Sequence, residues 1–409
     1  MSDLECWIWF SGLHCLRFRT RQALLDRFGS AKGIWFADRH ELELLPGLLP
    51  EERRALENRD SAEIERIVRR CREGGIRILT YQDAAYPERL RNIPDPPYVL
   101  YVLGTLPPID TEPLIAVVGT RRSSAYGERM ARRIAGEIAL CGGTVVTGLA
   151  AGIDSCAADA ALSAGGQVLG VLGVAINRVY PSYNGPLYER VKAQGALISE
   201  YAPDAEGSKE WFPRRNRIMA ALSLAVVVPE APDRSGALIT AHRALDYGKD
   251  VFAVPANADS PKGRGSNRLL REGAAFAECG WDVMQEYESL FPERITHAAA
   301  PPESGPTQET EPPEETREND TKSFFRFRVP QRREKTGPPS DVLESQLETL
   351  TEPQLKIVSV MDRPEMHVDD IIDLTQLPAS AVLSELTILQ IKGFVRQEQG
   401  KRFTLNIKK

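Results

Sequence analysis

Three turns of this 409-residue chain combine glycine with hydroxyl or basic side chains in a way that could bind phosphate. Each turn follows a short apolar run and opens a helical pattern, and the turns occupy residues 118–127, 147–154 and 232–240. Free amides and the dipole at a helix N-terminus attract anions, and glycine lets a phosphate approach the backbone. Tight packing would account for one such turn, but three in one domain favour phosphate binding. The candidate residues are Gly119, Thr120, Arg121 and Ser124, then Gly148, and then Ser235, Gly236 and Thr240.

A fourth segment, residues 209–219, crowds cations and aromatic rings at the start of a predicted helix. Cations follow a phosphate backbone, and aromatic rings stack on unpaired bases. Arg214 and Arg217 are three residues apart and therefore share one face of a helix. A solvated helix start with buried aromatic rings would explain the same residues equally well. The candidates from this segment are Lys209, Phe212, Arg214, Asn216 and Arg217.

The elements that position these residues alternate between short β-rich runs and helical patterns. The apolar runs are residues 77–81, 98–103, 114–118, 144–147, 168–172, 196–199, 224–228 and 250–254, and clear helical patterns cover 126–141 and 237–247. Strands that alternate with helices predict a parallel sheet with both faces covered. The turns that follow such strands gather at the carboxyl edge of the sheet, where ligands bind.

The remaining segments predict three further parts around this core, which itself covers residues 76–292. Residues 1–75 predict a small helical domain of the SAM or helix-hairpin-helix type, with helical spacing at 21–28 and 51–72. Its turn at residues 44–50 could bind a phosphate or serve only packing and partner contacts. Residues 293–344 are rich in Pro, Glu, Thr and Ser, which predicts a disordered linker. Residues 345–409 predict three short helices, at 352–361, 368–375 and 378–392, and then a hairpin, which together make a winged helix.

The composition excludes some classes of function but does not identify one. The net charge of −6 gives no sign of a nucleic-acid binder, although a global sum can conceal a local basic patch. No apolar stretch approaches the length of a membrane span, and the N-terminus lacks the pattern of a signal peptide, so we expect a cytoplasmic protein without membrane contact. The six cysteines form no CxxC pair, so we expect no metal site, and no motif calls for a cofactor.

Residues 86–282 resemble the DprA (Smf) family of bacterial natural transformation. The matching segments, in order and at family spacing, are residues 116–121, 148–154, 212–218, 235–241 and 251–255. The resemblance implies an α/β fold, an extended Rossmann-like parallel sheet core with a helical N-terminal domain and a C-terminal winged-helix domain. It also implies binding and protection of single-stranded DNA, loading of the RecA recombinase, and a homodimer. One departure is Ala158, where the family often has a histidine.

The resemblance also implies roles for individual residues. Arg121 would hold a phosphate, Lys209 would pair with the backbone, and Phe212 would stack on a base or form a wall of the pocket. Ser235 and Gly236 would supply hydroxyl and amide donors. Asn216 and Arg217 could contact DNA or could instead brace the loops around it. The dimer interface is not located by the sequence, and residues 266–271 and 282–290 are candidates because they lie away from the four DNA segments along the chain.

Two other functions compete with this one. A nucleotide-binding Rossmann-like hydrolase, similar to phosphoribohydrolases, could use Asp154, Glu200 or Glu230 as an acid or base. However, the turn at 235–243 lacks the glutamate of that group, and no Walker lysine follows a glycine loop, so we expect no catalytic residue and no enzyme. A duplex-DNA regulator would read bases through residues 378–392, but that helix is poor in cations. The basic, aromatic stretch 322–335 of the linker is either an accessory DNA contact or a solvated linker.

Overall fold

The computed structural model describes residues 1–297 and, nearer the C-terminus, residues 350–361, 366–375, 377, 382, 385–386, 388–390, 394–398 and 402–405. The chain divides into two compact units, Met1–Glu311 and Pro312–Lys409, and each is described by itself. From residue 298 to its end at 344, the predicted linker lies outside the described residues, and so does its basic, aromatic stretch. None of the helices in the described ranges has the length and apolar character needed to cross a membrane.

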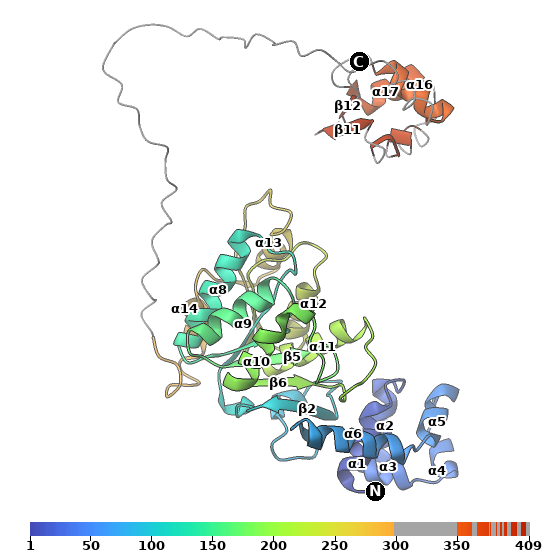
Figure 1. Ribbon diagram of the computed structural model, residues 1–409, viewed down its shortest axis with the longest axis vertical. Coiled ribbons are helices and arrows are strands. Elements are labelled where there is room, and N and C mark those ends of the chain that lie inside the picture. Colours follow the sequence, from blue (N-terminus) through green and yellow to red (C-terminus); the bar gives the residue numbers. More distant parts are fainter. Residues whose placement is uncertain are drawn as a thin grey trace. The chain divides into compact units, whose positions relative to one another are not determined.

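The first unit contains a sheet that is surrounded by helices (Figure 1). This sheet has nine strands in the order β1-β2-β6-β5-β4-β3-β7-β8-β9. The strands are β1 (Arg77–Thr80), β2 (Val99–Gly104), β3 (Leu114–Val117), β4 (Thr144–Thr147), β5 (Val168–Leu172), β6 (Ala196–Ser199), β7 (Ala225–Val228), β8 (Asp250–Ala253) and β9 (Ala275–Phe276). Strands β3 to β9 pair in parallel, which confirms the predicted core. Strand β2 differs, because it runs antiparallel to both β1 and β6.

Helices cover both faces of this sheet. One face carries α8 (Ala125–Leu140), α9 (Ile153–Ser163), α10 (Gly185–Gln194) and α14 (Gly280–Met284), and the other carries α7 (Glu88–Arg91), α11 (Trp211–Leu222), α12 (Gly236–Asp246) and α13 (Arg264–Arg271). Short 3-10 turns lie at Ile109–Thr111, Ser182–Asn184 and Gln285–Tyr287. Strand β3 shows the division, since Ile115 and Val117 pack with the first group while Leu114 and Ala116 pack with the second. Burial on both faces explains why these strands are apolar without alternation.

The strand order changes direction between β3 and β7. The chain moves outward from β3 through β4, β5 and β6, and then returns to place β7 on the other side of β3. Helix α8 leaves β3 toward one face of the sheet, and α12 leaves β7 toward the other. In open parallel sheets this divergence creates a crevice at the carboxyl edge, where ligands bind.

The N-terminal residues form a helical head that packs against strands β1 and β2 at one edge of the sheet (Figure 1). Its helices are α1 (Asp3–Gly12), α2 (Phe18–Phe28), α3 (Ala31–Phe36), α4 (Arg39–Glu43), α5 (Pro50–Glu57) and α6 (Ser61–Glu73). The ring of Trp7 stacks on Tyr98 with centroids 5.9 Å apart. The helical pattern predicted over 51–72 is interrupted between α5 and α6, because the carboxylate of Asp60 caps α6 by accepting from the amide of Ala62 at 3.0 Å.

The second unit contains helices and a small antiparallel sheet. Its described elements are α16 (Glu352–Val360), β10 (Met366–His367), α17 (Val368–Thr375), β11 (Val395–Glu398) and β12 (Arg402–Leu405), with the strand order β10-β12-β11. Apolar side chains from every part, including Ile357, Ile371 and Phe403, share one core. This arrangement confirms the predicted winged helix. The predicted helix 378–392 lies partly outside the described residues.

Candidate nucleic-acid interface

A cavity of about 810 Å³ opens at the crevice between β3 and β7, and we call it the loop cleft. Residues that follow β3 form one wall, residues that follow β7 form another, and the start of α11 forms a third. Ala150 and Asp154, from the turn after β4, also line the cleft, so it joins all four segments that the sequence analysis selected. Its predicted members are Gly119, Thr120, Arg121, Lys209, Phe212, Asn216, Ser235, Gly236 and Thr240. Ser124, Gly148, Arg214 and Arg217 are not among the lining residues.

Basic side chains surround the loop cleft. Arg121, Arg122, Lys209 and Arg234 line it with exposed side chains. Lys262, from the loop after β8, also lines it, and its Nζ donates to the carbonyl of Ser123 at 3.0 Å. These cations concentrate positive charge in one crevice of a chain whose net charge is −6. Such local focusing attracts a polyanion even where the whole protein is acidic.

Two aromatic rings add flat apolar surface to the same cleft. Phe212 lies half-buried at the start of α11, and its ring centroid is 5.2 Å from that of Tyr180. The guanidinium carbon of Arg121 lies 5.3 Å from the Phe212 centroid, within the range of a cation–π contact. The cleft therefore places a cation and a stacking surface side by side, which suits a phosphate and its attached base.

The N-terminus of α12 supplies polar groups to the cleft. A side-chain carbon added at Gly236 would meet no atom within 4 Å, so a ligand can approach this backbone closely. The Ser235 hydroxyl caps the helix by accepting from the Ala237 amide at 3.3 Å. The Thr240 hydroxyl is buried and has no hydrogen-bond partner within the described residues. Asn216 braces the turn instead, because its amide donates to the carbonyl of Gly236 at 3.2 Å.

A buried arginine and a buried aspartate form the floor of the cleft. Arg215 donates to the carbonyls of Gly148 and Val171, and Asp154 accepts from the amides of Gly148 at 3.1 Å and Gly119 at 3.3 Å. Burial raises the pKa of Asp154, although the charge of Arg215 acts against this shift. A side-chain carbon at Gly148 would lie 2.4 Å from the Arg215 guanidinium. Gly148 thus makes room for Arg215 beneath the cleft rather than for a phosphate.

Ser124 also differs from its predicted place. It is the N-cap of α8, and its hydroxyl accepts from the Gly127 amide at 3.0 Å. The same hydroxyl donates to the Glu230 carboxylate at 2.5 Å, and the Ser124 amide donates to that carboxylate at 2.8 Å. These contacts use the donors that a phosphate would need. Ser124 therefore stabilises the first turn, whose residues 119–122 line the cleft, and does not line the cleft itself.

Arg214 and Arg217 lie on the side of α11 that faces away from the glycine turns. Arg217 contacts Glu200 at 2.6 Å and Asp95 at 3.3 Å, and Arg214 contacts the same two carboxylates at 3.7 and 3.9 Å. We call these four residues the arginine–carboxylate cluster. Burial acts to raise the pKa of Glu200, but the charges of Arg217 and Arg214 outweigh it and hold this pKa below its usual value. The two arginines share a helical face as predicted, but that face binds carboxylates.

Several lining residues of the loop cleft were not selected from the sequence. Arg122 adjoins Arg121, and Arg234 lies within the third turn, so both could have been found by extending the same criterion. Arg215 lies inside the basic segment, but no pattern distinguishes it from its neighbours. Lys262 precedes Gly263 in the turn between β8 and α13, so the same criterion could have found it as well. Tyr180 comes from a loop without a glycine motif, so only the fold brings it to the cleft. Among the residues described, no group of three His, Cys, Asp or Glu side chains is placed to hold a metal ion.

Comparison with known families gives two matches along the chain. Residues 77–288 match the family described as DNA recombination-mediator protein A, and residues 342–401 match the DprA winged helix domain. The chain is 35% identical to protein Smf of Synechocystis over 342 residues, which cover 80% of this chain and 79% of that protein. It is 34% identical to the DNA processing protein DprA of Bacillus subtilis over 58% of this chain and 79% of that protein.

Solved structures of this family also resemble the chain. The crystal structure of DNA processing protein A from Streptococcus pneumoniae superimposes with a TM-score of 0.61 at 29% sequence identity. The superposition covers 70% of this chain and 98% of that one. The family matches span both the sheet domain that carries the loop cleft and the winged helix. The chain therefore belongs to the DprA/Smf family.

Proposed function

We propose that this protein binds single-stranded DNA in the loop cleft, protects it, and delivers it to the RecA recombinase without catalysing a reaction. The observation that carries the proposal is the charge of the cleft. Arg121, Arg122, Lys209 and Arg234 are exposed around it, while Asp154 is the one carboxylate among the described residues that line it. The charge of Asp154 is already engaged by Arg215 and by backbone amides. The cleft is thus left with a surplus of cations for phosphates.

The aromatic rings favour a single strand over a duplex. Phe212 and Tyr180 can stack only on bases whose faces are free, and paired bases in a duplex are stacked on one another. Arg121 beside Phe212 would then neutralise the phosphate next to the stacked base. This combination binds a strand with little regard to sequence, because every base has a flat face and every nucleotide has a phosphate.

The carboxylates near the cleft support binding without catalysis. A general base must reach a substrate proton with a free carboxylate oxygen. Asp154 accepts from the amides of Gly119 and Gly148, and Glu230 accepts from the amide and hydroxyl of Ser124. Glu200 belongs to the arginine–carboxylate cluster and, although its Oε2 has no hydrogen-bond partner among the described residues, that oxygen is buried and Glu200 does not line the loop cleft. Each candidate acid or base of the hydrolase hypothesis therefore has a structural task.

Oligonucleotide titrations test the binding proposal. We expect single-stranded DNA to bind more tightly than a duplex of equal length, with a salt slope near −0.7 for each neutralised phosphate. Arg121→Glu and Lys209→Glu should each weaken binding about tenfold or more and flatten the slope, because each removes a phosphate contact and adds a repulsive charge. Fluorescence anisotropy at two salt concentrations measures both effects.

Arg72→Glu is the matched control, because Arg72 is an exposed arginine on α6 and does not line the cleft. It should bind as the unmodified protein does. Equal affinity for duplex and single strand, or unchanged binding in both cleft variants, would contradict the proposal. Turnover of a nucleotide or of DNA that disappears in an Asp154→Asn variant would contradict the absence of catalysis.

Delivery to RecA and a homodimer complete the proposal. One cleft with a few phosphate contacts holds a strand weakly, whereas two clefts on a two-fold dimer hold it with avidity and can release it stepwise. Residues 266–271 and 282–290 are the candidate contacts between the two copies. We expect a dimer in sedimentation and faster RecA filament formation on DNA coated with single-strand-binding protein. A strict monomer would contradict the avidity, and a dimer without effect on RecA would contradict the loading.

A further inference from the structure

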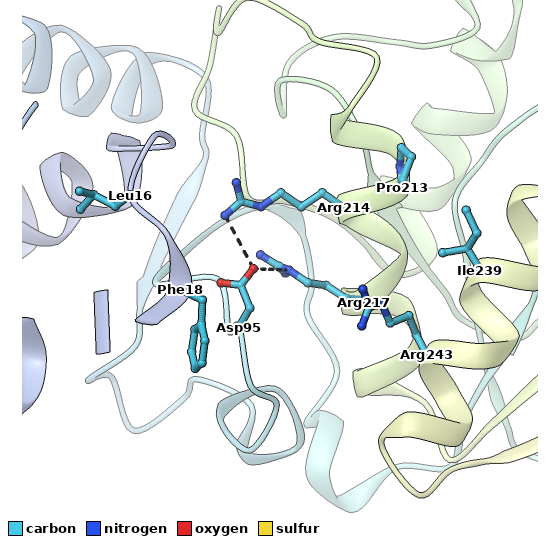
Figure 2. Close-up of a pocket in the computed structure, with 8 residues that line it drawn as sticks. All are labelled: Leu16, Phe18, Asp95, Pro213, Arg214, Arg217, Ile239 and Arg243. Carbon is cyan, nitrogen blue, oxygen red and sulfur yellow. Dashed lines mark hydrogen bonds and ion pairs between the residues drawn. The ribbon is translucent and has the colours of Figure 1, made fainter. Parts of the chain in front are cut away.

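A second cavity, of about 440 Å³, lies beside the loop cleft, and we call it the side cleft. Figure 2 shows the helical head on one side of it, with Phe18, and helices α11 and α12 on the other. Arg214 and Arg217 point from α11 toward the head, and Ile239 and Arg243 come from α12. The side cleft is therefore walled by two parts of the chain that the sequence treats as separate domains.

The two clefts share part of their lining. Pro213 and Ile239 line both of them, so these residues form a ridge with one cleft on each side. Pro213 is exposed at the first turn of α11, and Ile239 is 43% exposed on α12. Neither residue carries a charge that would repel a phosphate. A strand that leaves the loop cleft over this ridge enters the side cleft directly.

The side cleft repeats the chemistry of the loop cleft. Phe18 presents a partly buried ring from the start of α2. Arg243 lies one turn after Ile239 on the same face of α12, and its side chain is 54% exposed. It pairs with Asp246 at 3.6 Å, and this exposed ion pair costs little to exchange for a phosphate.

An unused donor lies at the bottom of the side cleft. Arg217 is only 7% exposed, and its Nε and Nη2 contact Asp95 and Glu200. Its third nitrogen, Nη1, is buried without a hydrogen-bond partner among the described residues. The Nε of Arg214 is likewise buried without a hydrogen-bond partner among the described residues. Buried donors without partners are rare in native proteins, and an absent ligand is one of their common explanations.

We propose that the side cleft is a second subsite for the same DNA strand, in which Phe18 stacks on a base and Arg243 contacts the adjoining phosphate. This proposal rests on the proposed function, because the strand must first occupy the loop cleft. The helical head then contributes directly to DNA binding as the second wall of a continuous path. Asp95 does not oppose the strand strongly, because Arg214 and Arg217 both face its carboxylate.

Strand length separates the two subsites experimentally. A single strand of about 4 nucleotides would fill the loop cleft alone, whereas one of about 16 would cross the ridge. Arg243→Glu and Phe18→Leu should each weaken binding of the longer strand about tenfold and leave the shorter strand unaffected, because a stacked base contributes on the order of a factor of ten. Phe18→Tyr keeps the ring and should bind as the unmodified protein does. Fluorescence anisotropy measures all of these affinities.

The controls distinguish this proposal from the one it rests on. Arg121→Glu should weaken both lengths, and Arg72→Glu should weaken neither. If Arg121→Glu weakens both lengths while Arg243→Glu and Phe18→Leu weaken neither, the side cleft is no subsite although the loop cleft binds DNA. If Arg243→Glu weakens both lengths alike, the effect is general electrostatics and the subsite is likewise refuted. If Arg121→Glu has no effect on either length, the proposed function itself fails.

Discussion

Basic side chains lie in two different environments on the two sides of helix α11. At the loop cleft, exposed cations from several loops face a single carboxylate whose charge is already engaged. On the other side of the helix, Arg214 and Arg217 face two carboxylates, Glu200 and Asp95. In the first environment positive charge remains available for a ligand. In the second, the carboxylates neutralise most of the positive charge within the protein. The difference arises from where β6 and the loop before β2 bring their acidic residues.

This contrast shows why a basic motif alone does not define a binding surface. The sequence shows how many cations are close together along the chain, but an anion responds to cations that remain unpaired in space. An arginine that is neutralised within the fold stabilises the fold, and an arginine that is left exposed can bind a phosphate. Each of the following predictions separates these two roles.

The largest effect is expected for the arginine–carboxylate cluster. Arg217→Met removes the closest partner of Glu200, so a buried carboxylate is left without its main counter-charge. Breaking a buried pair in this way costs about 3–5 kcal/mol of unfolding free energy. Urea denaturation measures the change. Arg72→Met, on an exposed arginine, should change stability by no more than about 0.5 kcal/mol. An equally small change for Arg217→Met would show that the cluster does not stabilise the fold.

A smaller effect is expected on acidification. The folded protein holds the pKa of Glu200 below its usual value, so the unfolded chain binds a proton at Glu200 more readily. Glu200 therefore stabilises the fold above the pKa of an unfolded glutamate, and this stabilisation is lost as the pH falls through the folded pKa. In Glu200→Gln the unfolding free energy should decline less steeply with falling pH than in the unmodified protein. Urea titrations at several pH values measure the two slopes, and identical slopes would contradict the prediction.

The smallest effect is expected at the loop cleft, and it should appear in binding alone. Gly236→Ala adds a methyl group where nothing lies within 4 Å, so stability should stay within about 0.5 kcal/mol. The methyl group would project into the space that a phosphate needs near the N-terminus of α12, and we expect affinity for single-stranded DNA to fall a few-fold. Gly185→Ala is the matched control, because Gly185 also begins a helix, α10, with open space around it. Equal affinities in the two variants would contradict a close approach at Gly236.

The sheet could be predicted closely from the sequence, because its strands are buried on both faces. All eight predicted runs correspond to strands β1 to β8, with ends that differ by at most one residue. The predicted parallel direction holds for β3 to β9 and is wrong only at β2, which runs antiparallel to its neighbours, because an apolar run carries no sign of its direction. Strand β9 was missed because its two residues, Ala275 and Phe276, are too few to form a pattern.

The candidate site was predictable only where a turn carries its own glycine and polar residues. Gly119, Arg121 and Gly236 line the loop cleft because each follows a strand end at the sheet edge. Tyr180 could not be found, because its position depends on the long-range folding of a loop without a motif. Lys262 precedes Gly263 in the turn between β8 and α13 and could have been found by the same criterion. The assignment of Arg217 to DNA could not be decided from the sequence, since Glu200 and Asp95 are far from it along the chain.

Helix α11 also limits how freely this part of the chain can change over evolutionary time. Trp211 stacks on Tyr201 at 3.7 Å, Phe212 enters the loop cleft, and every residue from 215 to 222 is buried. Of the twelve residues in the helix, Pro213 alone is exposed. A typical surface helix has a whole solvent-facing stripe on which substitutions can accumulate unnoticed by selection. This helix has almost none, so its sequence should drift more slowly than that of α10, even at positions that never touch DNA.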